Sequence, residues 1–196
     1  LPSFSLRRQG ILLHCLSDRL QDDEDSVREE AMKCLKKVAP LFPSGCEEIL
    51  RRELRDTRKD HRENAFEALK LASREWPEVG CLHLDELIRE EEDDLRIRGS
   101  MILRTIASKG GAEAWDLIGW SLQDEEVRVR RNASKTLTIL ADVEPRVAVI
   151  LVESSIGEDD RQIRGSVIKA LKKIDIQSPR VVQMILNGAA DKDLDM

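Results

Sequence analysis

The sequence predicts an all-α protein built from stacked pairs of helices. Aromatic residues make up only 3% of the 196 residues, with no Tyr, and charged residues make up 36%. Glycine and proline number only 10 and 6. This composition argues against a β-sandwich or barrel, whose strands favour aromatic residues and whose turns need glycine and proline. The third observation is a sequence pattern that recurs about every 34 residues.

The recurring pattern is an acidic residue followed six positions later by an arginine. It occurs as Asp22–Arg28, Asp56–Arg62, Glu92–Arg98, Asp124–Arg130 and Glu158–Arg164, so the interval between successive arginines is nearly constant. A sixth acidic residue, Asp191, follows Glu158 at a similar interval. Repetition at such a period is typical of repeat proteins.

Apolar stripes flank each acidic–arginine pair. Around Arg28 they include Val27, Ala31 and Leu35, whose spacing traces one face of a helix. A second stripe, Leu16 and Leu20, precedes Asp22. Each unit is therefore expected to be a helix, an acidic turn and a second helix.

We expect one array over residues 1–196. Its approximate units are 5–40, 44–76, 78–109, 111–143, 145–176 and a truncated sixth, 178–196. Pro43, Pro77, Pro145 and Pro179 fall between units, where a proline can start the next helix. The third unit fits least well, because Thr105 and Ser108 occupy expected apolar positions; either the frame slips there or the unit is irregular.

The repeated motif resembles the HEAT repeat, an armadillo-type helical repeat. The clearest copies run from Asp22 to Ala31 and from Asp124 to Ala133, with Val27-Arg28 and Val129-Arg130 at their centres. The resemblance covers nearly the whole chain and is to the short, regular type found in phycobilin-lyase-like HEAT proteins. It implies a right-handed α-α superhelix (α-solenoid), with first helices on the convex face and second helices on the concave face.

Two interpretations of the acidic–arginine pairs are open. In the structural one, which we favour, the arginine of one unit binds the acidic turn of its neighbour and sets the stacking angle, because a guanidinium suits carboxylates and carbonyls. In the functional one, the arginines form a ladder for phosphate or an acidic peptide.

The outward positions of the second helices are the candidate partner-binding surface. The selected residues are Glu29, Glu30, Lys33, Glu63, Asn64, Glu67, Arg131, Lys135, Lys169, Lys172 and Lys173. With Gly99, Ser100 and Leu103 also placed outward, the groove is expected to be acidic, then neutral, then basic. Gly99-Ser100 and Gly165-Ser166 indicate a close approach, either by a neighbouring helix or by a partner.

No residue pattern points to catalysis, a cofactor or a metal. His61 takes an apolar stripe position, so we expect a core histidine. The acidic run Glu90 to Asp94 lacks the glycine of a calcium loop and is expected to be solvated. Of Trp115 and Trp120, one is expected in the core and one against a neighbouring unit's loop.

The charge balance of −6 argues against a nucleic-acid-binding domain, which is usually basic. Cys15, Cys34, Cys46 and Cys81 show no metal-ligand spacing, which favours reduced thiols and a cytoplasmic protein. The longest apolar run, Val147 to Val152, is too short to span a membrane.

The predicted function is a non-catalytic scaffold that binds another protein or peptide through its concave face. Because the chain begins at Leu1, and because the sixth unit lacks a second helix, we expect a segment of a larger protein. One alternative is nucleic-acid backbone binding by the basic last third, through Arg128, Arg130, Arg131, Arg161, Lys169, Lys172 and Lys173. A lyase or enzyme-accessory role, by family analogy, is the other.

Overall fold

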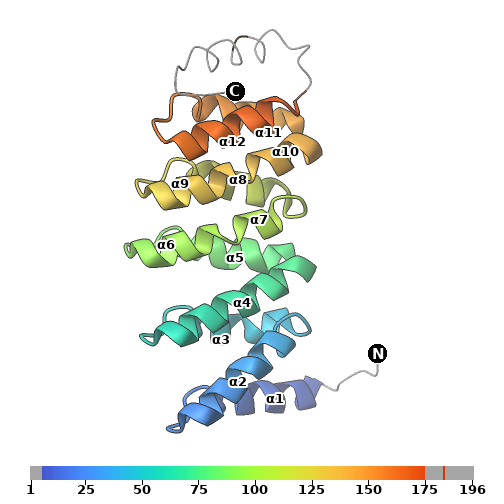
Figure 1. The fold of residues 1–196 in the computed structure, drawn as a ribbon. Helices are drawn as coiled ribbons and strands as arrows, with labels where there is room; N and C mark the ends of the chain where they lie inside the picture. The colour runs from blue at the N-terminus through green and yellow to red at the C-terminus, as the bar shows by residue number, and fades with distance from the viewer. Residues whose placement is uncertain (1–5, 175–182, 184–196) are drawn as a thin grey trace. The chain divides into compact units, whose positions relative to one another are not determined.

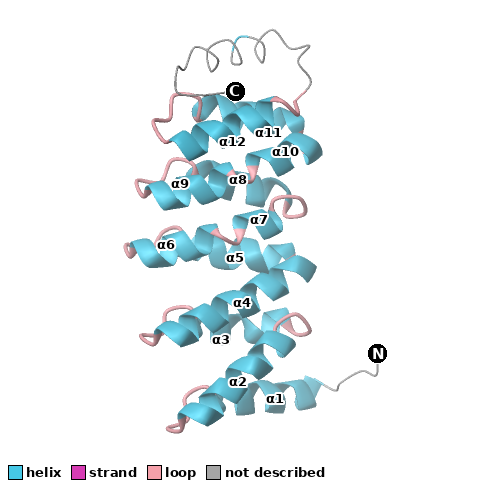
Figure 2. Cartoon of the chain, in the orientation of Figure 1, coloured by secondary structure: helices cyan, strands magenta, loops and turns pink. Residues whose placement is uncertain are grey.

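The computed structural model describes residues 6–174 and residue 183, and all regular secondary structure in this part of the chain is α-helical (Figure 2). The predicted all-α class is confirmed. The chain divides into two compact units, residues 1–83 and 84–196, with the boundary inside α5 (Pro77–Leu87). The expected sixth helix pair, 178–196, lies outside the described residues, and the handedness of the array stays a prediction.

The N-terminal unit contains two helix pairs, here called repeats 1 and 2 (Figure 1). Their helices are α1 (Leu6–Arg19), α2 (Asp25–Val38), α3 (Pro43–Glu53) and α4 (Lys59–Glu75). Within each pair the two helices pack on one another, and between the pairs α1 packs on α3 and α2 on α4. First helices therefore lie beside first helices, and second beside second.

The C-terminal unit completes repeat 3, which begins with α5, and contains repeats 4 and 5. Its further helices are α6 (Asp93–Ser100), α7 (Leu103–Ile106), α8 (Gly111–Ser121), α9 (Val127–Ser134), α10 (Leu137–Val143), α11 (Pro145–Ser154) and α12 (Arg161–Leu171). α6 packs on α9 and α9 on α12, so the second helices again lie side by side.

The first helices of repeats 2 to 5 begin at a constant interval along the chain. Pro43, Pro77 and Pro145 are the first residues of α3, α5 and α11, where a proline costs no hydrogen bond. Gly111 stands at the corresponding position of α8 with φ of +60°, a conformation that favours glycine.

The core follows the same interval. Four sets of equivalent positions are buried in every repeat. They are Leu16, Leu50, Leu84, Ile118 and Val152; Ala31, Ala65, Gly99, Ala133 and Val167; Leu35, Leu69, Leu103, Leu137 and Leu171; and Val38, Ala72, Ile106, Leu140 and Ile174. Within each unit, neighbouring repeats pack on one another and help to bury these side chains, as expected for stacked repeats.

The second helices of repeats 3 and 4 are broken, at Ser100 and Ser134, which occupy equivalent positions. The Ser100 hydroxyl donates to the Ile97 carbonyl at 2.6 Å, and the Ser134 hydroxyl to the Arg131 carbonyl at 2.9 Å. Such bonds compete with the helical ladder. Repeats 1, 2 and 5 carry Met32, Phe66 and Ile168 at this position, and their second helices are continuous.

Candidate binding face and the joints between repeats

The ladder arginines bind the turn of their own repeat. Arg28 Nη1 donates to the carbonyls of Asp22 and Asp23, at 2.5 and 2.8 Å. Equivalent pairs of bonds join Arg62 to Asp56 and Thr57, Arg130 to Asp124 and Glu125, and Arg164 to Glu158 and Asp159. The arginine thus satisfies two carbonyls that the turn leaves without a helical partner.

In repeat 3 the arginine in this role is Arg96, so the expected pair Glu92–Arg98 is wrong. Arg96 Nη1 donates to the carbonyls of Glu90 and Glu91, at 2.9 and 3.0 Å. Arg98 instead binds Asp94 on its own helix, at 2.8 Å. With the pair Glu90–Arg96 in place, the interval from each acidic–arginine pair to the next is the same throughout the five repeats. Repeat 3 therefore keeps the same frame as the other four.

Within the C-terminal unit the same arginines also reach the next repeat. Arg96 Nε lies 3.1 Å from Asp124 Oδ2, and Arg130 Nε lies 2.9 Å from Glu158 Oε2. One guanidinium therefore fixes its own turn and the adjacent turn together. The interaction expected between an arginine and its neighbour's acidic turn is present at these two joints, alongside the bonds within each repeat.

Arg131, selected as a partner-binding residue, takes part in the last of these joints. Its guanidinium binds Asp160 Oδ2 at 2.7 Å. Asp160 also caps α12, accepting from the backbone N–H groups of Gln162 and Ile163. The bond from Arg131 is the main cause that lowers the pKa of Asp160 below its ordinary value.

The joint between repeats 1 and 2 uses a buried polar pair. His61 Nδ1 lies 2.8 Å from Glu53 Oε2, and both side chains are buried. Glu53 Oε1 accepts from Gln21 of repeat 1 and from Arg52, which in turn reaches Ser17. His61 is a core histidine, as expected, but its partner Glu53 was not predicted from the sequence.

Asp56 lies beside this pair and is held by Arg58. Arg58 Nε and Nη2 donate to the two carboxylate oxygens, at 2.8 and 2.6 Å. These bonds lower the pKa of Asp56 to about 2. Among the described residues, Glu53, Asp56 and His61 have ligand atoms close enough to share one ion. Arg52, Gln21 and Arg58 already occupy the carboxylate oxygens, so the group is a hydrogen-bonded clasp.

The selected partner-binding residues lie on the second helices, in the break between α9 and α10 (Lys135) or just after α12 (Lys172 and Lys173), and remain accessible. Glu29, Glu30, Lys33, Glu63, Glu67, Lys135, Lys169, Lys172 and Lys173 are exposed, and Asn64 and Arg131 are half-buried. Lys33 pairs with Glu30 on its own helix, and Lys173 binds Asp142. The sequence-predicted surface is thus available on each unit's second helices, apart from the use of Arg131 at a joint.

The middle of the predicted surface needs correction. Gly99, Ser100 and Leu103 were placed outward but are buried. A Cβ on Gly99 would lie 3.0 Å from Leu87 Cβ, so the close approach there is by α5 of the same repeat. Gly165 has open space around it and is not equivalent to Gly99.

The outward positions of repeat 3 are taken by other residues, which sequence reasoning missed because of the frame error. They are Arg98, Met101 and Arg104; Met101 is 61% exposed. With Lys135, Lys169, Lys172 and Lys173, these arginines make the second-helix face of the C-terminal unit basic through repeats 3, 4 and 5. The residues expected in the middle of the face, Gly99, Ser100 and Leu103, are thus replaced there by Arg98, Met101 and Arg104.

Trp120 lies outside this face, on the first helix of repeat 4. The ring is 52% exposed, and the Arg89 guanidinium stands over it, 4.7 Å from the ring centre. Arg89 belongs to the turn of repeat 3, so the tryptophan contacts a neighbouring repeat's loop, as one of the pair was expected to do. Trp115 is half-buried.

No family model matches the chain, and no curated protein matches its sequence. Solved structures do match. One engineered protein superposes with a TM-score of 0.57 and 18% identity, over 91% of this chain and 87% of its own. A second engineered protein superposes with a TM-score of 0.54 and 16% identity, over 90% of this chain and 85% of its own. A chain from a structural study of TOG–tubulin binding specificity superposes with a TM-score of 0.54 and 16% identity, over 94% of this chain and 89% of its own.

The chain has a HEAT-like helical-repeat fold. The similarity to these structures, together with the consecutive packing of helix pairs within each unit, confirms the predicted α-solenoid class. Among the helices that the structure describes, none combines the length and apolar character that a bilayer crossing requires.

Proposed function

We propose that the protein is a non-catalytic scaffold that binds another protein through the outward positions of its second helices. The observation that carries this is a contrast between two sets of positions. The seventh residue after each ladder arginine is a buried leucine in all five repeats. The fifth is exposed and changes, as Lys33, Glu67, Met101, Lys135 and Lys169. A regular core with a varied surface is typical of recognition on a repeat scaffold.

The charge on the C-terminal unit indicates an acidic segment as its partner. Arg98, Arg104 and Lys169 lie on its second helices, Lys135 in the break between α9 and α10, and Lys172 just after α12, with Asp142 as an exposed acidic residue among them. Complementary charge speeds encounter and selects partners. The face of the N-terminal unit is mainly acidic, through Glu29, Glu30, Glu63 and Glu67, and is expected to prefer a basic segment.

Two further observations support a scaffold role. The fold is shared with a chain from a study of TOG–tubulin binding specificity, so helical repeats of this type occur in a protein-binding setting. The four cysteines are thiols outside any disulfide, which fits a reducing compartment such as the cytoplasm.

The test is a quantitative pull-down from an extract of cells that express the full protein. Lys169→Glu/Lys172→Glu reverses two charges on the proposed face. Arg8→Glu/Arg146→Glu makes the same change in net charge at exposed positions on first helices, α1 and α11. We expect the first variant to lose captured protein at least tenfold and the second to keep it. Equal capture by both variants would contradict the proposal.

Nucleic-acid backbone binding is the second candidate, and the extension of the basic face into repeat 3 favours it. Its signature is affinity that falls steeply with salt. Retention of a DNA or RNA duplex at about 50 mM salt, lost in Lys169→Glu/Lys172→Glu, would support it. No retention would exclude it. The lyase or enzyme-accessory alternative stays a prediction.

A further inference from the structure

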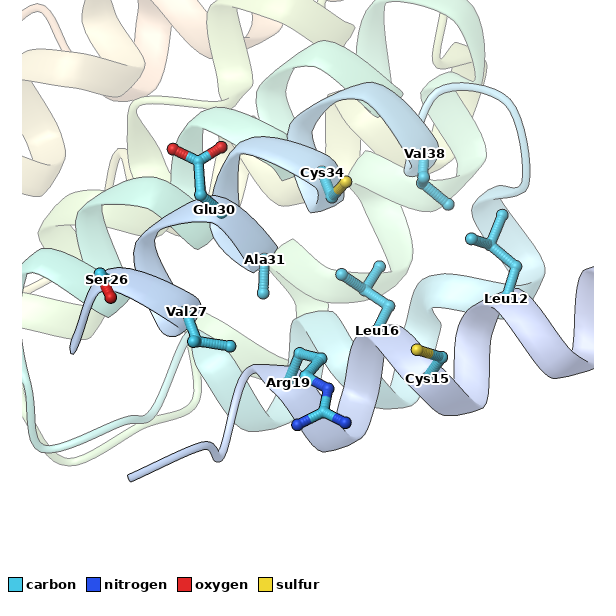
Figure 3. A pocket seen from close by; sticks show the side chains of 10 residues that line it. All are labelled: Leu12, Cys15, Leu16, Arg19, Ser26, Val27, Glu30, Ala31, Cys34 and Val38. Atoms are coloured by element: carbon cyan, nitrogen blue, oxygen red, sulfur yellow. The ribbon is translucent and has the colours of Figure 1, made fainter. Parts of the chain in front are cut away.

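The N-terminal unit carries an apolar groove of about 540 Å³ along α1 and α2 (Figure 3). Its floor and walls are apolar side chains from both helices, and Arg19 and Glu30 stand among its lining residues. Two thiols, Cys15 and Cys34, also line it, and both are exposed. The apolar lining includes Leu12, Leu16, Val27, Ala31 and Val38.

The constant interval between repeats shows what the groove corresponds to. One repeat further along, the equivalent positions are buried, because α1 and α2 pack against α3 and α4. These covered positions are Cys46, Ile49, Leu50, His61, Ala65, Ala68 and Ala72.

The same holds in the C-terminal unit. There α6 and α7 of repeat 3 pack against α8 and α9 of repeat 4, and the equivalent positions are again buried. They are Ala114, Leu117, Ile118, Val129, Ala133, Thr136 and Leu140. In both cases the covering element is the helix pair one repeat earlier. Among the faces of this kind on repeats 1, 2, 4 and 5, each taken within its own unit, the groove is the one on which the described residues place no helix pair.

We propose that the groove is the docking site for another helix pair of the same repeat class, joined to the array as the repeat that precedes α1. The surface continues an interface that the protein already builds within each unit from equivalent residues. A preceding repeat would bury Leu12, which is 37% exposed, as its equivalents Cys46 and Ala114 are buried. It would also cover both thiols.

The two groove cysteines make this occupancy measurable. Cys34 stands where repeats 2, 3 and 4 have Ala68, Ile102 and Thr136, all buried. Cys15 stands where repeats 2 and 4 have Ile49 and Leu117, also buried. Both thiols should therefore react rapidly with a thiol reagent in the present chain and slowly once a preceding repeat is seated. Cys46 and Cys81 are buried in the present chain and act as internal references.

The experiment duplicates residues 9–42 in tandem within the full chain. The added copy stands ahead of the native one, with both of its cysteines replaced by serine so that only the native thiols report. We expect the labelling of Cys15 and Cys34 to slow by about tenfold or more, because labelling then requires local opening. We also expect the melting temperature to rise by several degrees. A matched duplication with Leu12→Asp in the native copy should regain fast labelling, whereas Leu41→Asp, outside the groove, should not.

Unchanged labelling would overturn the proposal. A groove that docks this class of repeat is expected to hold the added helix pair in its folded form, so failure of the added pair to fold would count against the proposal as well. A different result would assign the groove to a second copy of the chain. In that case labelling of the unmodified protein slows as its own concentration rises, and a dimer appears in size-exclusion chromatography. That outcome would also overturn the proposal.

Discussion

Arg96 of repeat 3 joins two successive turns: its Nη1 binds the Glu90 carbonyl and its Nε lies 3.1 Å from Asp124 Oδ2. Only 6% of Arg96 is exposed, so these bonds form largely away from water. Removing the side chain leaves polar groups without partners at a joint between repeats.

Arg96→Ala is therefore expected to destabilise the protein by about 2–3 kcal/mol, because turn carbonyls and a carboxylate lose a buried cationic partner. Arg98→Ala removes an arginine two positions away whose bond to Asp94 is within one helix, and should cost less than about 1 kcal/mol. Urea unfolding of both variants measures the difference. Equal losses of stability in the two variants would contradict the assignment of Arg96, rather than Arg98, as the arginine that holds the turn of repeat 3.

The clasp between Glu53 and His61 leads to a prediction of non-additivity. Repeat 3 has Leu87 and Leu95 at the equivalent positions, so the site can be apolar. His61→Leu alone leaves the buried Glu53 without one partner and should cost about 2–4 kcal/mol. Glu53→Leu/His61→Leu restores the apolar pair and should recover most of that loss. A double variant that is as unstable as the sum of the single ones would contradict this account.

The bond between Arg58 and Asp56 makes stability depend on acid. The pKa of Asp56 is lowered to about 2 in the folded protein, from an ordinary value near 4 in the unfolded chain. Its contribution, about 1–2 kcal/mol, is therefore present above pH 4 and is lost as the pH falls towards 2. Asp56→Asn should flatten the stability profile between pH 4 and 2. An unchanged slope over that window would show that Asp56 is not the group responsible.

Gly99 and Gly165 are expected to respond to alanine in opposite directions. At Gly165, inside α12, a Cβ meets nothing within 4 Å, so Gly165→Ala should stabilise by about 0.5–1 kcal/mol through helix propensity. At Gly99 the added methyl would meet Leu87 and Leu84, and overpacking should make Gly99→Ala destabilising by about 1–2 kcal/mol. Thermal unfolding of the two variants measures both effects. Stabilisation by alanine at both sites would contradict the overpacking expected against α5.

The fold could be predicted because its core is local and repeats. Each apolar stripe lies within one helix, so the interval between stripes is visible in a single sequence. The frame of repeat 3 was not predictable from the motif alone. The run Glu90 to Asp94 places an acidic residue six positions before both Arg96 and Arg98. A strictly constant interval between repeats was the signal that distinguishes them.

The sequence gives only weak signals of the clasp and of the breaks in the second helices. Glu53 and His61 replace residues that are leucine in repeat 3, and a paired change of this kind is visible once the frame is right. Ser100 and Ser134 share one position, which could have indicated the breaks in those helices. The groove on α1 and α2 depends on which faces remain uncovered, so it required the three-dimensional packing.

Repeats 3 to 5 of the C-terminal unit stack in a constant register, so that the arginine of one repeat meets the acidic turn of the next. A double-mutant cycle between Arg130 and Glu158, one repeat apart, tests this register most directly, with Arg130 and Asp159 as the matched control. The account predicts a coupling of about 1 kcal/mol or more for the first pair and near zero for the second. No coupling between Arg130 and Glu158 would contradict it.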